Sequence, residues 1–205
     1  MSGFAVITLG ALLAVSWMVM QMAKLPGTAK LSAATSAPPH AALADQNAGL
    51  SYELLPSPWH DGCPMRDYPV GWTSGEGVLA GHVSTGGQRL KWYGNACAGL
   101  LPKGFRSGSL AKEAASAFDA IDTDSALSHH RTVTSSSALR VSGHKAWVVR
   151  FTVRFSAHGL PWSSEAGAVT VIDRGSGHAP AVLYFSVPSN LGGTATVSTL
   201  ITSLR

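Results

Sequence analysis

The most regular pattern of hydrophobic and polar positions lies late in the chain, at residues 145–156 (KAWVVRFTVRFS). Every second residue from position 147 to position 155 is apolar, and Arg150, Thr152 and Arg154 stand between them. Successive side chains of a strand point to opposite faces, so this alternation predicts an antiparallel strand with one face on a core and one in water.

Other apolar runs, bounded by glycine, proline and serine, predict the remaining strands. They span residues 51–55, 77–83, 89–93, 131–141, 167–173 and 181–187. The turn sequences Ser-Thr-Gly-Gly and Ser-Gly join the second run to the third, and the fourth to the main strand, as hairpins. The last two runs are apolar on both faces, which is typical of strands in the middle of a covered sheet.

Two segments show helical spacing instead. The first helix is predicted at residues 110–121, with Phe118 and Ile121 on its apolar stripe and Glu113 off that stripe. The second is predicted at residues 194–204. Together the elements predict an α+β fold, an antiparallel sheet of about five to seven strands with helices packed on it.

The amino-terminal segment is continuously apolar, without the alternation of apolar and polar residues seen in the predicted strands and helices. Residues 3–23 carry no charge, and at about 1.5 Å per helical residue they would span roughly 31 Å, enough to cross a bilayer. We therefore expect a transmembrane anchor at 1–24, a flexible tether rich in Pro, Ser, Thr and Ala at 25–48, and a folded domain at 49–205. The alternative is a cleaved signal peptide, although those have a shorter apolar run and a small-residue cleavage site where Lys24 stands.

Composition narrows the classes of function. Charged residues make up only 13% of the chain, and the net charge is +4 without any run of Lys or Arg. Nucleic-acid binding needs a basic patch or stripe, so we expect no nucleic-acid partner.

Cys63 and Cys97 are the only cysteines, and they lie in the turn-rich loops HDGCP and GNACAG. Such a pair predicts a disulfide formed in an oxidising compartment, and hence a domain outside the cytoplasm. Lys24 and Lys30 oppose this orientation by the positive-inside rule. A zinc site with His60 and Cys63 as two ligands is the alternative, but no third and fourth ligand can be named from the sequence.

The candidates for chemistry are few, and each has a simpler structural interpretation. His129-His130 invites an acid–base or metal site, His60-Asp61 a hydrolase triad, and the pair Glu76 and Glu165 a glycosidase. No nucleophile elbow G-x-S-x-G accompanies the histidines. The sequence therefore predicts no catalytic residue, metal or cofactor.

A surface for a partner or ligand is the better lead. Loop tryptophans can line such a surface, and the candidates are Trp59, Trp72, Trp92 and Trp162. Arg150 and Arg154, with Arg131 and Arg140 alongside on the adjacent strand, would form a positive stripe. The alternatives are that the tryptophans cover the core and that a helix packs over the arginine stems.

The order of elements over residues 50–205 is similar to the PsbP-like α-β-α sandwich. The loops WHDGCP and WYGNACAGLLP, with SGHKAWVVRF and APAVLYFSVPSN, also resemble a group of uncharacterised membrane-anchored actinobacterial envelope proteins. That second resemblance implies a location and a shared domain, and no activity.

These features predict a single-pass membrane protein whose extracytoplasmic domain is a binding or assembly module, with an envelope protein or a cell-wall component as its partner. One alternative is an envelope hydrolase with a site assembled from dispersed His and carboxylate residues. The other is a structural domain whose role is membrane tethering alone.

We expect a cysteine introduced on the domain surface to react with a membrane-impermeant maleimide in intact cells. The physical reason is that the oxidised cysteine pair requires the outer side of the membrane. Labelling that appears only after lysis would place the domain in the cytoplasm.

Overall fold

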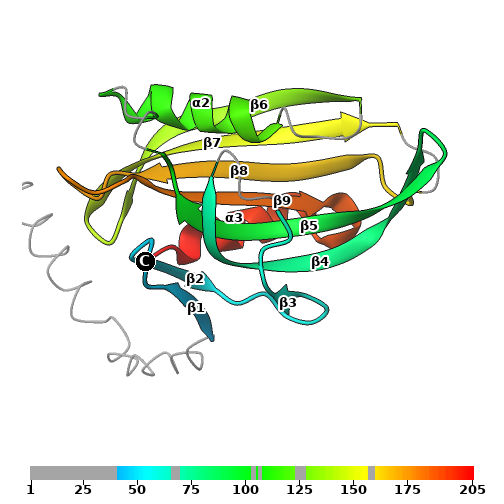
Figure 1. The fold of residues 1–205 in the computed structure, drawn as a ribbon, viewed down its shortest axis with the longest axis horizontal. Helices are drawn as coiled ribbons and strands as arrows, with labels where there is room; N and C mark the ends of the chain where they lie inside the picture. Colours follow the sequence, from blue (N-terminus) through cyan, green and yellow to red (C-terminus); the bar gives the residue numbers. More distant parts are fainter. Residues whose placement is uncertain (1–40, 66–69, 103–104, 106–107, 123–127, 157–159) are drawn as a thin grey trace, which may run out of the picture. The chain divides into compact units, whose positions relative to one another are not determined.

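The apolar runs of the sequence fold into strands that lie side by side (Figure 1). The computed structural model describes residues 41–65, 70–102, 105, 108–122, 128–156 and 160–205, which fall in one compact unit, His40–Arg205. The strands are β1 Ala42–Asp45, β2 Leu50–Glu53, β3 His60–Asp61, β4 Gly71–Thr85, β5 Gln88–Leu100, β6 His129–Val141, β7 His144–Phe155, β8 Ser164–Ile172 and β9 Ala181–Pro188. The helices are α2 Leu110–Asp122 and α3 Gly193–Ser203, with a short 3₁₀ turn, η2 Ser189–Leu191, before α3.

Seven strands form one sheet in the order β3-β4-β5-β9-β8-β7-β6, and every neighbouring pair is antiparallel. The predicted α+β class and antiparallel sheet are confirmed, with the strand number at the top of the expected range. The predicted hairpins are present as β4–β5 and β6–β7. In the β6–β7 turn both Ser142 and Gly143 have positive φ, which matches the right-handed twist of the flanking strands.

Each face of the sheet carries its own core. We call the cluster that includes Ala114, Phe118 and Ile121 of α2 the α2-side core. The cluster that includes Val197, Leu200 and Ile201 of α3, with Leu43 and Tyr52 of the β1–β2 hairpin, is the α3-side core. Strands β8 and β9 contribute to both, as their two apolar faces predicted.

The expectation of one wet face on β7 holds for only half of that strand. Ala146 and Val148 lie on the predicted polar face, yet both are buried in the α3-side core. Only the part with Arg150 and Arg154 leaves that core. A second departure is Glu113 of α2, predicted off the apolar stripe but only 5% exposed.

The folded domain begins earlier than expected. Residues 42–48 fall within the predicted tether, but β1 pairs with β2 in a separate two-stranded sheet, and Leu43, Asp45 and Ala48 are buried. Burial of these side chains offsets the weak strand propensity of so short a segment. The remainder of the predicted tether, residues 25–40, and the predicted anchor lie outside the described residues. Within the described residues, neither helix combines the length and the apolar character needed to cross a bilayer.

The predicted disulfide is present and joins Cys63 to Cys97, with their Cα atoms 5.4 Å apart. Cys63 follows the two-residue edge strand β3, and Cys97 lies on β5, so the bond passes over β4. It crosses at Gly75, where a Cβ would approach the Cys63 Cβ to 2.9 Å. The bond thereby fastens the edge of the sheet to a strand nearer its centre.

We expect the double variant Cys63→Ala/Cys97→Ala to lose about 3–4 kcal/mol of unfolding free energy, because the disulfide closes a loop with a sequence separation of 34 residues. Denaturant unfolding with and without reductant measures the loss. The reductant should destabilise the wild type and leave the variant unchanged. A variant as stable as the oxidised wild type would contradict this role.

Candidate functional site

Four carboxylates are buried in the domain: Asp45, Glu76, Glu113 and Glu165. In contrast, every Lys and Arg whose side chain the structure describes is at least partly exposed. A ligand at the described surface can therefore contact these cations directly, whereas the four buried carboxylates are out of its reach.

Asp45 shapes the first part of the candidate site. Burial opposes its ionisation, but hydrogen bonds from the Ala48 N–H at 2.8 Å and from the hydroxyls of Thr73 and Ser74 outweigh this and lower the pKa of Asp45. The same carboxylate thus closes the turn between β1 and β2 and attaches that turn to β4. The turn is held in place as one wall of a pocket.

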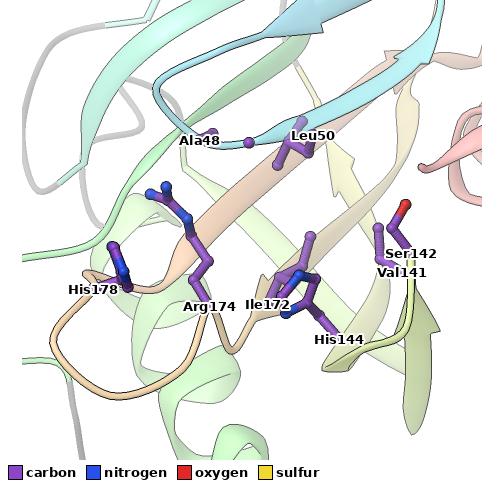
Figure 2. Close-up of a pocket in the computed structure, with 9 residues that line it drawn as sticks. Ala48, Leu50, Val141, Ser142, His144, Ile172, Arg174 and His178 are labelled. Carbon is purple, nitrogen blue, oxygen red and sulfur yellow. The ribbon is translucent and has the colours of Figure 1, made fainter.

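This pocket has a volume of about 220 Å³ and lies where three turns meet (Figure 2). The β1–β2 turn contributes Gly49, the β6–β7 hairpin contributes Ser142 of its turn and His144 of β7, and the β8–β9 connection contributes Arg174 and His178. Its apolar part is formed by Ala48, Leu50, Val141 and Ile172. No carboxylate lines it, so its ionisable side chains are those of one arginine and two histidines. We call it the Arg174 pocket.

Arg174 is the central side chain of this pocket. It is half-buried, and no hydrogen bond or ion pair to any described residue engages its guanidinium group. Its side chain extends toward the β1–β2 turn, where a Cβ on Gly49 would lie 3.7 Å from one guanidinium nitrogen (Figure 2). Gly49 has a φ of +67°, so the turn favours glycine there and leaves the guanidinium group uncovered by a side chain.

The chemistry of the pocket is that of binding. A guanidinium group offers a planar fork of N–H donors that matches carboxylate and phosphate oxygens. Ser142 and His144 both line the pocket, but no hydrogen bond joins them as a nucleophile and its base. Among the described residues, no cluster of three His, Cys, Asp or Glu side chains is arranged to hold a metal ion.

Sequence reasoning missed this pocket. Residues 174–178 (RGSGH) follow the predicted strand at 167–173 and resemble an ordinary turn, and His144 stands between the predicted Ser142-Gly143 turn and the main strand without any role predicted for it. The available signal was an arginine and a histidine on either side of a glycine-rich turn. What the sequence lacked was the information that the β1–β2 turn packs opposite them.

The predicted tryptophan surface is divided between the two faces of the sheet. Trp59 packs against the α3-side core and Trp72 against the α2-side core. Trp162 is buried, with its ring over Gly81, and Trp92 is half-buried with its ring centroid 5.5 Å from that of Phe155. This placement favours the alternative in which these side chains cover the core.

The predicted arginine stripe is shorter than expected. A bulge between Val133 and Ser135 shifts the register by one residue, so Arg131 faces Val153 instead of Arg154. A shift of one residue moves a side chain to the other face of the sheet. Arg131 therefore contacts α2, with an ion pair of 2.7 Å to Asp119 and its guanidinium over the Phe118 ring.

Arg140 is also on the other face, because it lies opposite Lys145. Arg150 and Arg154 remain on the α3 side of the sheet, with His130 opposite Arg154. Arg150 is half-buried and Arg154 is exposed.

The candidates for chemistry are dispersed. His129 and His130 lie on β6 and His60 and Asp61 on β3, at opposite edges of the seven-stranded sheet. Glu76 lies opposite Ala96 of the α3-side core, whereas Glu165 shares the face of Val169 and Val171 in the α2-side core. The two carboxylates are on opposite faces, so they cannot flank one glycosidic bond.

Glu165 has a structural environment of its own. Its carboxylate accepts hydrogen bonds from the Trp92 indole N–H and from the Ser186 hydroxyl, the latter at 2.6 Å. Burial raises its pKa, and these two donors oppose the rise; the nearby Trp162 indole also favours the charged form, although its N–H lies outside standard hydrogen-bond geometry. The net pKa of Glu165 is above its ordinary value.

The arrangement of strands and helices is similar to that of a solved structure. The solution structure of cyanobacterial PsbP (CyanoP) from Synechocystis sp. PCC 6803 matches with a TM-score of 0.50, covering 80% of this chain and 91% of that chain. The fold is PsbP-like. The sequence identity is 12%, so the likeness concerns the fold alone. No protein-family model matches the sequence, and no curated protein matches it by sequence.

The raised pKa of Glu165 predicts a pH-dependent stability of the PsbP-like domain. The folded state holds this proton more tightly than the unfolded chain, so stability falls as the pH rises above the ordinary pKa of 4.5 and through the raised value. Glu165→Gln removes this dependence. We expect the unfolding free energy of the variant, relative to wild type, to rise as the pH increases above the ordinary pKa of 4.5.

Urea denaturation at a series of pH values measures this difference. Asp45→Asn is the matched control, because its lowered pKa confines the titration of Asp45 to acid pH and leaves no slope above about pH 5. A relative stability of Glu165→Gln that stays constant with pH would contradict the raised pKa.

Proposed function

We propose that this chain is a non-enzymatic binding module of the cell envelope, and that its Arg174 pocket receives an anionic group of the ligand. The observation that carries the proposal is the half-buried guanidinium group of Arg174, which has no acidic partner among the described residues. Partial burial strengthens the attraction between this group and an anion, since the local dielectric constant is lower than in water.

The charge distribution supports the same ligand class. Asp45, Glu76, Glu113 and Glu165 lie inside, so a ligand at the surface meets the exposed cations directly and makes no contact with these four carboxylates. Direct contact with arginine and lysine favours carboxylate or phosphate groups.

The location belongs to the same proposal. The disulfide between Cys63 and Cys97 favours an oxidising compartment, and the uncharged residues 3–23 favour attachment to the membrane. The PsbP-like domain would then present the Arg174 pocket outside the cytoplasm, near the membrane. The hydrolase alternative has less support, because its candidate residues are spread over both edges and both faces of the sheet.

We expect the full chain, purified in a mild non-ionic detergent, to bind galacturonate and inorganic phosphate at low ionic strength. A charge-assisted hydrogen bond contributes about 1.5–3 kcal/mol, so Arg174→Ala should weaken binding at least about tenfold. Nuclear magnetic resonance titration of the ligand signals measures both affinities.

Arg89→Ala is the matched control, because Arg89 is an exposed arginine that does not line the Arg174 pocket. It lies beside the β4–β5 turn, at one end of β5, whereas the other end of β5 pairs with the start of β9, which follows the β8–β9 connection. It should bind like the wild type. Equal affinities of the wild type and Arg174→Ala for both probes would refute the assignment of the pocket.

A further inference from the structure

A second cavity lies on the other side of the β6–β7 turn. It is an open groove of about 790 Å³ between the beginning of α2 and the ends of β6 and β7. The residues important here are Leu110, Arg140, Lys145, Trp147 and Asp173. We call it the Trp147 groove.

The groove and the Arg174 pocket are formed by consecutive residues. On β7, His144 lines the pocket and Lys145 lines the groove; after β8, Asp173 lines the groove and Arg174 lines the pocket. The exposed turn residues Ser142 and Gly143 lie between them, and a Cβ on Gly143 would meet nothing within 4 Å. The pocket lies on the α3 side of the sheet and the groove on the α2 side, so a chain-like ligand that reaches both bends around this turn, where the space beside Gly143 is open.

The charges of the groove favour an anion. Arg140 and Lys145 lie directly opposite each other on β6 and β7, and both are exposed. Like charges at directly opposite positions destabilise a strand pair. The groove also holds the carboxylate of Asp173, which accepts a hydrogen bond from the Gly175 N–H at 3.0 Å, so the two cations outnumber the carboxylates. An anionic group of a ligand would relieve the repulsion.

The aromatic ring of Trp147 favours a ligand larger than a simple ion. The ring is half-buried, and its N–H donates a hydrogen bond of 2.8 Å to the Ser136 hydroxyl, which fixes its orientation. A fixed aromatic ring beside cations is suited to a unit with both an apolar face and a negative charge. A sugar ring that carries a carboxylate or phosphate has this combination.

We propose that the ligand is an anionic glycan chain that occupies both cavities at once. This inference rests on the proposed function, since one charged unit enters the Arg174 pocket. The following units cross Ser142 and Gly143, place a sugar ring near Trp147 and bring a second negative charge to Arg140 and Lys145. Engagement of two sites by one chain raises affinity beyond that of either site.

Isothermal titration of the full chain in mild detergent with oligogalacturonates of one to eight units tests this. We expect the affinity of the wild type to rise at least about tenfold between the monomer and the longest oligomer. The double variant Arg140→Ala/Lys145→Ala should lose this gain and keep the affinity for the monomer. Arg174→Ala should weaken binding of every length, and Arg89→Ala should weaken none.

The outcomes separate the two proposals. Monomer binding that depends on Arg174, without a gain in longer oligomers or without a loss in the double variant, overturns the glycan chain and leaves the proposed function intact. Monomer binding that is unaffected by Arg174→Ala overturns the proposed function itself. Poly-L-glutamate of matched charge should bind more weakly than the oligogalacturonate of eight units. If it binds with equal affinity and with the same dependence on Arg140 and Lys145, the ligand class is an acidic peptide instead.

Discussion

Strands β8 and β9 are covered on both faces, with only Ser164, Ala166 and Tyr184 partly exposed, and the remainder of the domain is arranged around this constraint. Their side chains alternate between the α2-side core and the α3-side core, so each face of the sheet must be covered. Helix α2 covers one face. Helix α3 and the β1–β2 hairpin cover the other, and for this reason a short and weakly predicted hairpin becomes part of the folded domain. The Arg174 pocket exists because that hairpin ends opposite the β6–β7 and β8–β9 connections.

The periodicity of the sequence was sufficient to predict the elements with long regular patterns. Strand β7, its hairpin with β6, both helices and the disulfide agree with expectation, since each depends on local spacing or on a unique cysteine pair. The predictions were wrong where one irregularity or one packing contact, absent from the local sequence pattern, changed the structure of a segment. The bulge after Val133 moved Arg131 to the other face, and packing on the α3-side core ordered β1. Neither event leaves a periodic signal.

The candidate site was harder to predict than the fold. Its polar residues come from three turns that are distant in the sequence, and each turn alone is explained by its glycine content. The simpler interpretation of Glu76 and Glu165 in the sequence is that they are solvent-exposed carboxylates in loops. Glu76 and Glu165 are instead satisfied inside by hydrogen bonds from Leu55, Trp92 and Ser186. A count of charges along the chain cannot reveal such a separation between inside and outside.

The bulge in β6 has a consequence beyond the placement of one arginine. β6 is an edge strand of 13 residues, and β7 is the only strand among the described residues that pairs with it. Long and regular edges of this kind are templates for pairing with another copy of the chain, and proteins restrict this with bulges and charged side chains. The bulge divides β6 into two shorter stretches. Arg131 lies in the stretch before the bulge, and Arg140 lies in the stretch after it. The irregularity that misled the sequence prediction thus protects the domain against edge-to-edge aggregation.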